Sequence, residues 1–549
     1  MLATESRYIH WNSVSYLALI LYTIASSLLY FAVAFTYRLT FHPLAKYPGP
    51  FFARISDWPL IIHCYRGDRH LWEYKNHQKY GPIVRYGANS LSISTPSSIP
   101  LIHGAKANVK KGSWYKTLDI SAGAPSVQME IDKHQHAMRR RFLAPAFSER
   151  ALKEAEKLIS ISARKLCLGL TSGAKNGEWS DPQNFNDWAT FFGFDFISDL
   201  GYGQSFGMLD HDDNRWIPGV LKSASIFLYY VGYLPFIEFV RPLMGTWVQD
   251  YVGGQAAADS LKFTNLANGR LAERTELEKQ RKSNNIDPDR KDTFHYLLNS
   301  KDSVTGKMFT TEQLQADSAL IIAAGSDGVA VTLAACMFYL LDNPHAMEIV
   351  TKEIRESFES TDEISNPKLG SLPYLHACLE ETLRMNPPKP SSLPREVLKG
   401  GLMMDGHLIA QGVNVGSPLY VIHHDPSVFS DPWKFRPERW IASSPRGVTP
   451  EDVSAAKAAC APFLIGPMNC IGKNMSYTAL KLALAHLLLE NDVRVSGKLT
   501  GGGAHDDVEQ LRQRKGEYQM IDWILGFRDG PMIEVKQMER ANERSENIG

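Results

Sequence analysis

A long run of apolar residues near the N-terminus is the first pattern along the chain. No charged residue occurs between Trp11 and Tyr37, and the centre reads VSYLALILYTIASSLLYFAVAF. A helix that spans a bilayer needs roughly 20 apolar residues, and no polar face divides this run. A signal peptide would have a shorter apolar centre and a small-residue cleavage site. The pattern therefore predicts a transmembrane anchor over 11–37, behind a short N-terminal segment over 1–10.

Charges and prolines define the segment after the anchor. Arg38 and Lys46 lie just beyond it, a positive bias that places the downstream bulk on the cytosolic side of the membrane. The segment HPLAKYPGP contains Pro43, Pro48 and Pro50, and so many prolines are incompatible with a helix. We expect residues 38–50 to form a stiff, extended tether, and the remaining residues to form the body of the protein.

The body reads as mainly helical with a minor β part. Alternation and periodicity predict a helix ending at Gly81 and two strands over 82–94. From about 130 to 390 the pattern is mostly helical, for example over 311–341, with a polar loop over 279–292. Strand patterns return in GLMMDGHLIA and in DWILGFRDGPMIEVKQ, where Asp529 and Gly530 favour a hairpin turn.

The apolar stretch SASIFLYYVGYLPFIEFV, residues 223–240, could be mistaken for a second membrane span. It is interrupted by Gly232, Pro235 and Glu238 and is barely long enough to cross a bilayer. We expect a helix–loop–helix with an exposed apolar face that dips into the membrane surface or covers a substrate entrance.

Composition narrows the class of protein. With 59 basic and 59 acidic residues the chain has no net basic character, which argues against nucleic-acid binding. Its six cysteines are scattered without any CxxC pair, so a reducing compartment fits better than a disulfide scaffold. They are Cys64, Cys167, Cys336, Cys378, Cys460 and Cys470.

One cysteine stands in a special context, in the segment PFLIGPMNCIGKN. Gly466 and Gly472 bracket Cys470, and a long apolar helix is predicted directly afterwards. A helix N-terminus stabilises a thiolate through its dipole and free backbone N–H groups, and glycines let a flat cofactor approach the backbone. By its surroundings alone, Cys470 is either a thiolate ligand or a structural cysteine at the start of a helix.

Here the sequence resembles the cytochrome P-450 family. Phe463, Gly466, Cys470 and Gly472 match the haem-binding signature FxxGxxxCxG of that family. Other family features occur in the expected order, and the resemblance covers roughly residues 40–540. They are the ExxR pair Glu381 and Arg384, the PER-like segment with Arg439, the haem-propionate position Arg395, and His136 with Arg140 where the family has WxxxR.

The resemblance implies a single haem-thiolate catalytic domain over 51–549 with the cytochrome P-450 fold, mainly α with small β-sheets. It implies haem b with Cys470 as the axial iron ligand, Phe463, Gly466 and Gly472 shaping its loop, and His136, Arg140 and Arg395 near the propionates. Glu381, Arg384 and Arg439 would form a buried structural network.

The same resemblance implies how such an enzyme works in the cell. Electrons from NADPH would arrive through a separate cytochrome P-450 reductase, with cytochrome b5 as a further partner, since no GxGxxG fingerprint is found in the chain. The enzyme would be single-pass in the endoplasmic reticulum membrane and oxidise an apolar, lipid-partitioning small molecule. The phrases KYGPIVRYG and HHDPSVFSDPWKFRPERW look most like microsomal enzymes of fungal terpenoid or polyketide biosynthesis.

Two positions depart from the family pattern. The central helix usually carries an acid followed by an alcohol beside the oxygen-binding pocket, whereas here Asp327 is followed by Gly328. Either water, Ser326 or a substrate hydroxyl completes the proton relay of a hydroxylase, or the reaction depends little on proton delivery. Met468 replaces a cation that most relatives direct at a propionate, leaving fewer positive charges there.

Several alternatives stay open at this point. Within the class, the enzyme could catalyse coupling, rearrangement or dehydration; outside it, the chain could be a haem-binding sensor or a membrane-anchored scaffold. Arg139 and Arg141 are either a docking site for an acidic reductase or a solvated helix face. We expect pocket contacts in the 119–130 loop, the 223–240 segment, the helix near Ala323 and the Pro390–Leu393 turn.

Overall fold

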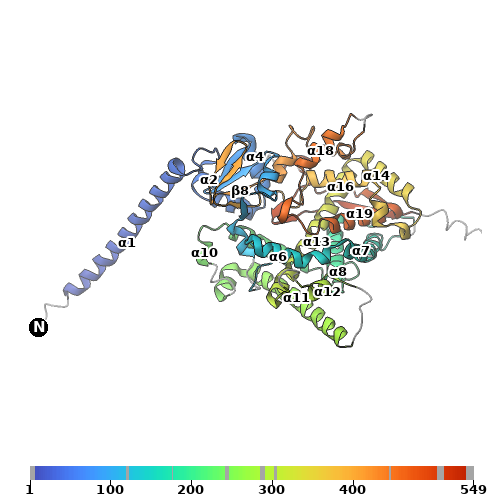
Figure 1. Ribbon diagram of the computed structural model, residues 1–549, viewed down its shortest axis with the longest axis horizontal. Helices are drawn as coiled ribbons and strands as arrows, with labels where there is room; N and C mark the ends of the chain where they lie inside the picture. Colours follow the sequence, from blue (N-terminus) through green and yellow to red (C-terminus); the bar gives the residue numbers. More distant parts are fainter. Residues whose placement is uncertain are drawn as a thin grey trace, which may run out of the picture.

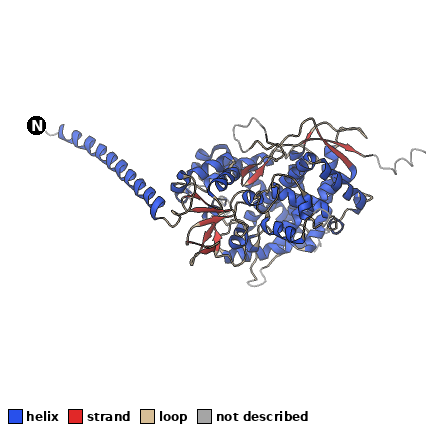
Figure 2. Cartoon of the chain, turned by 90° about the horizontal axis from the view of Figure 1, so that it is seen from above, coloured by secondary structure: helices blue, strands red, loops and turns tan. Residues whose placement is uncertain are grey.

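A computed structural model shows a mainly helical body with small β-sheets and one long N-terminal helix that projects from it (Figures 1 and 2). The structure describes the chain except for 1–5, 119–122, 176, 241–245, 285–290, 302–305, 444–446, 504–511 and 539–549. The prediction of a mainly α fold with a minor β part is confirmed.

Helices make up most of the body. The α-helices are α1 (Ser6–Thr36), α2 (Phe51–Ile55), α3 (Trp58–Arg66), α4 (Arg69–Tyr80), α5 (Ser98–His103), α6 (Lys133–Leu143), α7 (Glu149–Leu170), α8 (Phe185–Tyr202), α9 (Ile217–Val231), α10 (Ile237–Val240), α11 (Trp247–Ser283), α12 (Thr293–Asn299), α13 (Thr311–Asp342), α14 (Pro344–Ser357), α15 (Asn366–Leu369), α16 (Pro373–Met385), α17 (Leu419–His423), α18 (Pro450–Ala459) and α19 (Lys473–Glu490). Short 3-10 or π segments are η1 (Tyr37–Phe41), η2 (Ser113–Leu118), η3 (Ala144–Phe147), η5 (Thr361–Glu363), η6 (Pro437–Trp440) and η8 (Gly466–Met468).

Helix α13 is the central element of the helical core and fulfils the expectation for 311–341. It begins at a capping box in which the Thr310 hydroxyl accepts from Gln313 N–H while the Gln313 side chain accepts from Thr310 N–H. From Val329 to Leu340 its side chains are buried, because α8, α16 and α19 surround this half. A helix that is apolar on every side must be enclosed by protein, and α13 is so enclosed at its C-terminal half.

Five strands form the main sheet, in the order β1-β2-β8-β5-β3, at the end of the body nearest α1 (Figure 2). Its strands are β1 (Ile83–Gly87), β2 (Ser90–Ile93), β3 (Val109–Lys111), β5 (Arg395–Val397) and β8 (Asn414–Gly416). Smaller sheets contain β4 (Gln183–Asn184), β6 (Leu402–Met404), β7 (His407–Ile409), β9 (Asn491–Val495), β10 (Ile521–Trp523), β11 (Leu525–Phe527) and β12 (Met532–Gln537). The predicted helix ending at Gly81 and the strands over 82–94 are confirmed.

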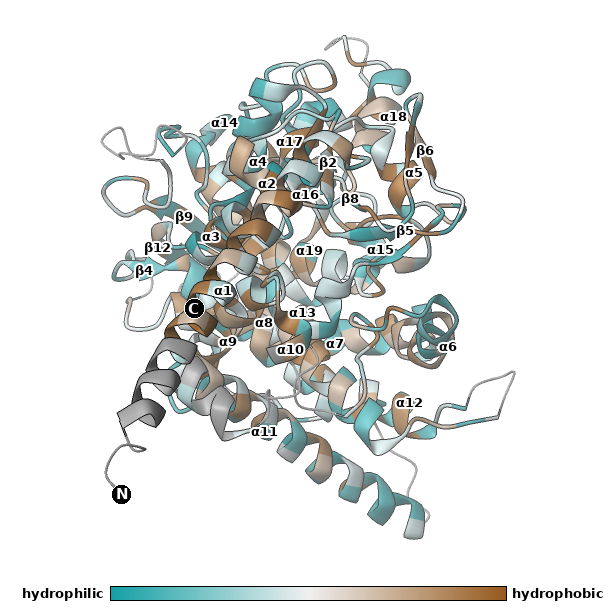
Figure 3. Ribbon diagram, turned by 90° about the vertical axis from the view of Figure 1, so that its left-hand side faces the viewer, coloured by the Kyte–Doolittle hydropathy of each residue, from teal (hydrophilic) through white to brown (hydrophobic). Residues whose placement is uncertain are grey.

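The N-terminal helix meets the requirements of a membrane span by length and composition. The stretch Tyr16–Phe41 has a mean hydropathy of 2.1, and none of its most apolar window is buried against the body. Figure 1 shows this helix projecting from the body, and Figure 3 shows that its described part is mainly hydrophobic. A second helix, Thr311–Asp342, passes the same test, but 61% of its apolar window is buried, as befits the core helix α13.

The segment after this helix differs from the extended tether that its prolines predict. Residues 42–47 form successive turns, with Leu44 and Tyr47 buried against the main sheet. Arg38 donates a hydrogen bond to the carbonyl of Ile55 (2.5 Å), and the Arg85 guanidinium donates to the carbonyl of Arg38 (2.7 Å). The prolines exclude a helix, as expected, but burial of two side chains folds the segment onto the body instead of extending it.

Three further expectations can be compared with the fold. The 223–240 segment is a helix–loop–helix, as predicted, and Phe239 on α10 is 84% exposed. The prediction of a polar loop over 279–292 is wrong at its start, because α11 continues to Ser283. Residues 285–290 of this loop lie outside the described residues. The hairpin at Asp529–Gly530 is also wrong: β11 pairs with β10, whereas β12 pairs with β4 and β9.

A buried carboxylate on α16 joins this helix to η6. Glu381 accepts hydrogen bonds from Arg384 Nε and Nη2, both at 2.8 Å. It also accepts from Arg439 Nε (2.9 Å), Trp440 Nε1 (3.0 Å) and the backbone N–H of Arg436 (3.0 Å). Burial alone would raise the pKa of Glu381, but the two guanidinium groups and these hydrogen bonds outweigh it and lower the pKa. The group is therefore ionised in the folded protein.

The Glu381 network extends to the loop that carries Cys470. Arg384 Nη1 donates to the carbonyl oxygens of His423 (2.7 Å) and Pro432 (2.8 Å). The backbone N–H of Ala461, at the start of the Cys470 loop, donates to His423 Nε2 (3.4 Å). The position of that loop thus depends on a charge network centred on α16.

Glu381→Gln should lower the free energy of unfolding by about 3–5 kcal/mol, because it leaves two buried guanidinium groups without their carboxylate. Chemical unfolding of the purified protein measures this change. Since the folded pKa of Glu381 is lowered, its contribution is complete above the ordinary carboxyl pKa and is lost as the pH falls through the folded value. The control Glu356→Gln removes an exposed pair with Lys352 and should cost less than about 0.5 kcal/mol; equal losses would contradict the prediction.

Candidate active site

The Cys470 loop is held in a fixed shape by its own backbone. The N–H of Cys470 donates to the carbonyl of Phe463 (2.9 Å), which closes the loop. Gly466 has φ +72°, and a Cβ there would lie 2.3 Å from the carbonyl oxygen of His103. Only glycine fits this position, for both its backbone conformation and the close approach. Helix α19 begins at Lys473, immediately after Gly472.

Cys470 differs from the other five cysteines, which are all buried while Cys470 is exposed. The surrounding protein still desolvates its sulfur, which raises the pKa of the thiol, whereas the Gly472 N–H, Arg140 and Lys473 act to lower it. The thiol therefore faces open space from a loop that offers it one backbone donor and two positive charges.

A cluster of basic side chains lies beside this loop. Arg140 donates to the backbone carbonyl of Asn469 (2.5 Å) and to its side-chain oxygen (2.6 Å), so it fixes the residue that precedes Cys470. Arg395 on β5 donates to the Tyr115 hydroxyl (2.8 Å). Lys111 is buried and donates to the carbonyl of Val127 (3.0 Å).

The groups of this cluster act on one another's pKa values. Burial lowers the pKa of His136 to about 3, with further lowering by Lys111, Arg140 and Arg395. Burial and the same arginines lower the pKa of Lys111 to about 7. The structure thus brings together His136, Arg140 and Arg395, and adds Lys111. That lysine was missed, although the burial alternation of β3 places it on the same face as Val109.

Both alternatives considered for Arg139, a docking surface and a solvated helix face, are wrong. Its guanidinium is buried and forms an ion pair with Asp317 on α13 (2.9 Å). Arg139 therefore joins α6 to α13 inside the protein, while Arg141, the other member of the proposed docking pair, is exposed.

On α13, Asp327 and Gly328 face a cavity, whereas Ser326 does not line it. The Ser326 hydroxyl is buried and donates to the carbonyl of Ile322 within its own helix (2.7 Å). Gly328 is open, since a Cβ added there would meet no atom within 4 Å. Of the three groups that could complete the relay, Ser326 is thereby removed, and water or a substrate hydroxyl remains.

Asp327 is paired with a lysine that sequence reasoning missed. Lys389 Nζ lies 3.5 Å from Asp327 Oδ2 and donates a hydrogen bond to the carbonyl of Ile524. Burial raises the pKa of Asp327, while Lys389, Arg528 and the Gly526 N–H oppose the rise. Burial lowers the pKa of Lys389, while Asp327 and Asp522 oppose the fall. Lys389 directly precedes the predicted pocket turn Pro390–Leu393, and this position in the sequence was the one indication that it could line the cavity.

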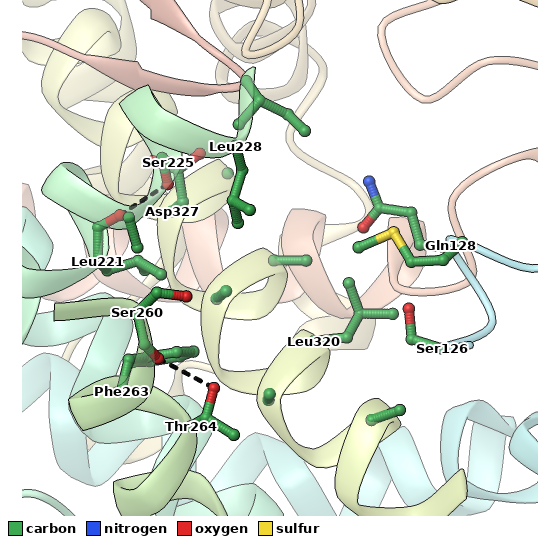
Figure 4. A pocket seen from close by; sticks show the side chains of 18 of the residues that line it. Ser126, Gln128, Leu221, Ser225, Leu228, Ser260, Phe263, Thr264, Leu320 and Asp327 are labelled. Carbon is green, nitrogen blue, oxygen red and sulfur yellow. Dashed lines mark hydrogen bonds between the residues drawn. The ribbon is translucent and has the colours of Figure 1, made fainter. Parts of the chain in front are cut away.

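The cavity beside Asp327 has a volume of ≈ 200 Å³ (Figure 4). Its wall comes from Ser126, Gln128 and Met129, from α9, α11 and α13, and from Lys389 and Ile524. Figure 4 shows Ser126 and Gln128 on one side and Ser225 and Asp327 on the other, with Leu320 between them. The expected contributions of the 119–130 loop, the 223–240 segment and the helix near Ala323 are found, although 119–122 lie outside the described residues.

Comparison with known proteins gives this arrangement its class. The family model "Cytochrome P450" matches residues 54–500. The chain is 34% identical over 533 residues to the cytochrome P450 monooxygenase fscF of Fusarium equiseti, covering 96% of this chain and 97% of that protein. It is 33% identical to the monooxygenase AKT7 of Alternaria alternata (92% and 95% covered) and 32% identical to poxM of Penicillium oxalicum (92% of each).

The chain therefore belongs to the cytochrome P450 family, and it is a cytochrome P450 monooxygenase. Membership implies a haem with a thiolate ligand, and the site fits such a group. The thiol comes from a loop whose backbone is shaped by glycine, and the basic cluster of Lys111, Arg140 and Arg395 suits the two carboxylates that a haem carries. Within the described residues, no group of three or more His, Cys, Asp or Glu side chains could hold a metal ion by itself.

Arg140→Met should lower the haem content of the purified protein several-fold, because it removes both the restraint on Asn469 and one cation of the basic cluster that suits the haem carboxylates. The haem-to-protein ratio, measured by the pyridine haemochromogen assay, tests this. Arg141→Met, at the exposed neighbour, serves as the matched control and should keep full loading. Equal haem loading of both variants would contradict a role of Arg140 in haem binding.

Proposed function

We propose that this chain is a membrane-bound haem-thiolate monooxygenase with Cys470 as the axial iron ligand, and that it hydroxylates, epoxidises or desaturates an apolar small molecule in fungal secondary metabolism. The exposure of Cys470 in a glycine-shaped loop beside a basic cluster is the observation that carries the assignment. The fungal origin of the relatives supports the pathway. The resemblance of KYGPIVRYG and HHDPSVFSDPWKFRPERW to fungal terpenoid and polyketide enzymes adds the substrate class to the proposal.

Each residue around the haem has its own task in this proposal. When bound, haem b supplies the oxidation by activating dioxygen, and thiolate ligation favours O–O cleavage. Phe463, Gly466 and Gly472 shape the cysteine loop. Arg140, Arg395 and Lys111 hold the two haem carboxylates, and they supply the positive charge that Met468 lacks. His136 lies in the same cluster, where burial and the neighbouring cations lower its pKa to about 3.

Electrons come from NADPH through a separate membrane-bound reductase, with cytochrome b5 as a second donor. The apolar N-terminal helix supports a single-pass location in the endoplasmic reticulum membrane with the catalytic domain on the cytosolic side. The exposed Phe236 and Phe239 lie next to α9, which lines the cavity, and so support entry of a lipid-partitioning substrate there.

Asp327 is the acid at the wall of the cavity; burial raises its pKa, while Lys389 and Arg528 oppose the rise. With Gly328 open and Ser326 turned into its helix, no side-chain hydroxyl follows the acid in the relay. This arrangement favours a proton route through water or the substrate. It is also the observation behind a second candidate, a coupling, rearrangement or dehydration reaction that needs little proton delivery.

Cys470→Ala should abolish the red-shifted absorption band of the reduced, CO-treated protein, since this band reports thiolate ligation. Cys460→Ala is the matched control, because that cysteine is buried nearby at the end of α18 and should leave the band in place. A band that persists in Cys470→Ala would refute the assignment, as would its absence from the wild-type protein, which would also leave the sensor and scaffold alternatives standing.

Gly328→Thr should change the fraction of NADPH-derived electrons lost as hydrogen peroxide by several-fold, because it restores an alcohol beside Asp327. The open space at Gly328 accepts the new side chain without a clash at Cβ. Peroxide and NADPH are measured together in a reductase-reconstituted reaction. Gly328→Ala adds the Cβ without the hydroxyl and is the matched control; an unchanged peroxide fraction in the threonine variant would remove the proton-delivery role from this position.

A further inference from the structure

Lys389 places a positive charge in a cavity that is otherwise mostly uncharged. Among the described residues that line it, Asp327 and Lys389 are the ionisable ones. The Lys389 side chain is 29% exposed, and since it lines the cavity, this exposed part is available to a bound molecule. Burying an ammonium group is costly unless its protons find acceptors, so its partners decide what the cavity can bind.

The protons of Lys389 are only partly used. An ammonium group has three donors. One donates to the carbonyl of Ile524, and a second faces Asp327 Oδ2 at 3.5 Å, an ion pair without a good hydrogen bond. In the described part of the chain no acceptor is found for the third proton. Lys389 can therefore donate one further hydrogen bond towards the cavity.

The charges around Lys389 are already balanced. Asp522 and Arg528 act on the pair electrostatically, so two carboxylates face two cations. Asp522 accepts from Ser391 and from the Tyr229 hydroxyl, and Arg528 donates to Asn386 (2.6 Å). An anionic ligand would bring a third negative charge next to Asp327 without a free cation to match it. A neutral oxygen acceptor fits without this cost.

We propose that Lys389 determines substrate specificity by donating a hydrogen bond to a neutral oxygen of the substrate. The substrate is then an apolar molecule that already carries a hydroxyl or carbonyl oxygen. An earlier oxygenating or hydrating reaction must have placed that oxygen. This inference rests on the proposed monooxygenase function and adds the substrate class to it.

Three probes with one rigid carbon skeleton test the proposal: trans-decalin, trans-1-decalone and trans-decalin-1-carboxylate. Binding to the full-length holoenzyme in lipid nanodiscs is followed by calorimetry and by the spin-state change of the haem spectrum. The wild type should bind the ketone at least about tenfold more tightly than the hydrocarbon, as expected for a hydrogen bond from a charged donor. The carboxylate should bind more weakly than the ketone.

Variants then assign the preference to Lys389. Lys389→Met should reduce the ketone-to-hydrocarbon ratio to within about twofold, and Lys389→Arg should keep it, because arginine retains the donors. The double variant Lys389→Met/Asp327→Asn removes both charges together and should lose the ratio in the same way. Ser225→Ala is the matched control: its hydroxyl already donates to the carbonyl of Leu221 (2.7 Å), so the ratio should be kept.

The outcomes separate this proposal from the proposed function. Equal binding of ketone and hydrocarbon by the wild type, binding of neither, or a preference that survives in Lys389→Met overturns it. Tightest binding of the carboxylate also overturns it, in favour of an acidic substrate. The CO band of each variant is recorded in parallel, since a wild type without that band would instead remove the haem-thiolate function.

Discussion

The arrangement of the active site depends on one buried carboxylate. Glu381 neutralises Arg384 and Arg439 inside the protein, and in doing so joins α16, η6 and the backbone around His423. Ala461 donates to the His423 ring, so the loop that presents Cys470 is positioned from α16 rather than by its own sequence alone. A buried charge network of this kind is costly to desolvate, and the loss of one member leaves the others unpaired. The position of the Cys470 loop therefore depends on every member of the network.

The two sides of the proposed haem site use charge differently. Beside Cys470, Lys111, Arg140 and Arg395 gather positive charge with few counter-charges, which suits a ligand that brings two carboxylates. Around Asp327, in contrast, acids and bases are matched, which suits a neutral substrate. Gly328, which lacks the usual alcohol, and the ammonium group of Lys389 lie at the same cavity wall, so the proposed proton route and the proposed substrate contact are close together.

The range of each interaction decided how well the sequence could predict it. The helix ending at Gly81, the capped start of α13 and the glycine-shaped Cys470 loop are set by local patterns, so they could be read from the residues. The contacts of Lys111 and Lys389 and the Arg139–Asp317 pair could not be predicted, because the residues that they join are distant in the chain. The Asp529–Gly530 turn signal misled for the same reason: β12 finds its partners in β4 and β9, far away in sequence.

The folded segment after the N-terminal helix has a mechanical consequence. Leu44 and Tyr47 pack against the main sheet. Arg38 donates a hydrogen bond to the carbonyl of Ile55, and Arg85 donates one to the carbonyl of Arg38, so both sides of the junction are bound to the body. A flexible linker would leave the orientation of the body relative to the N-terminal helix unrestricted. The junction therefore couples the direction of the apolar helix to the body, so that a membrane holding this helix would meet the body in a restricted range of orientations.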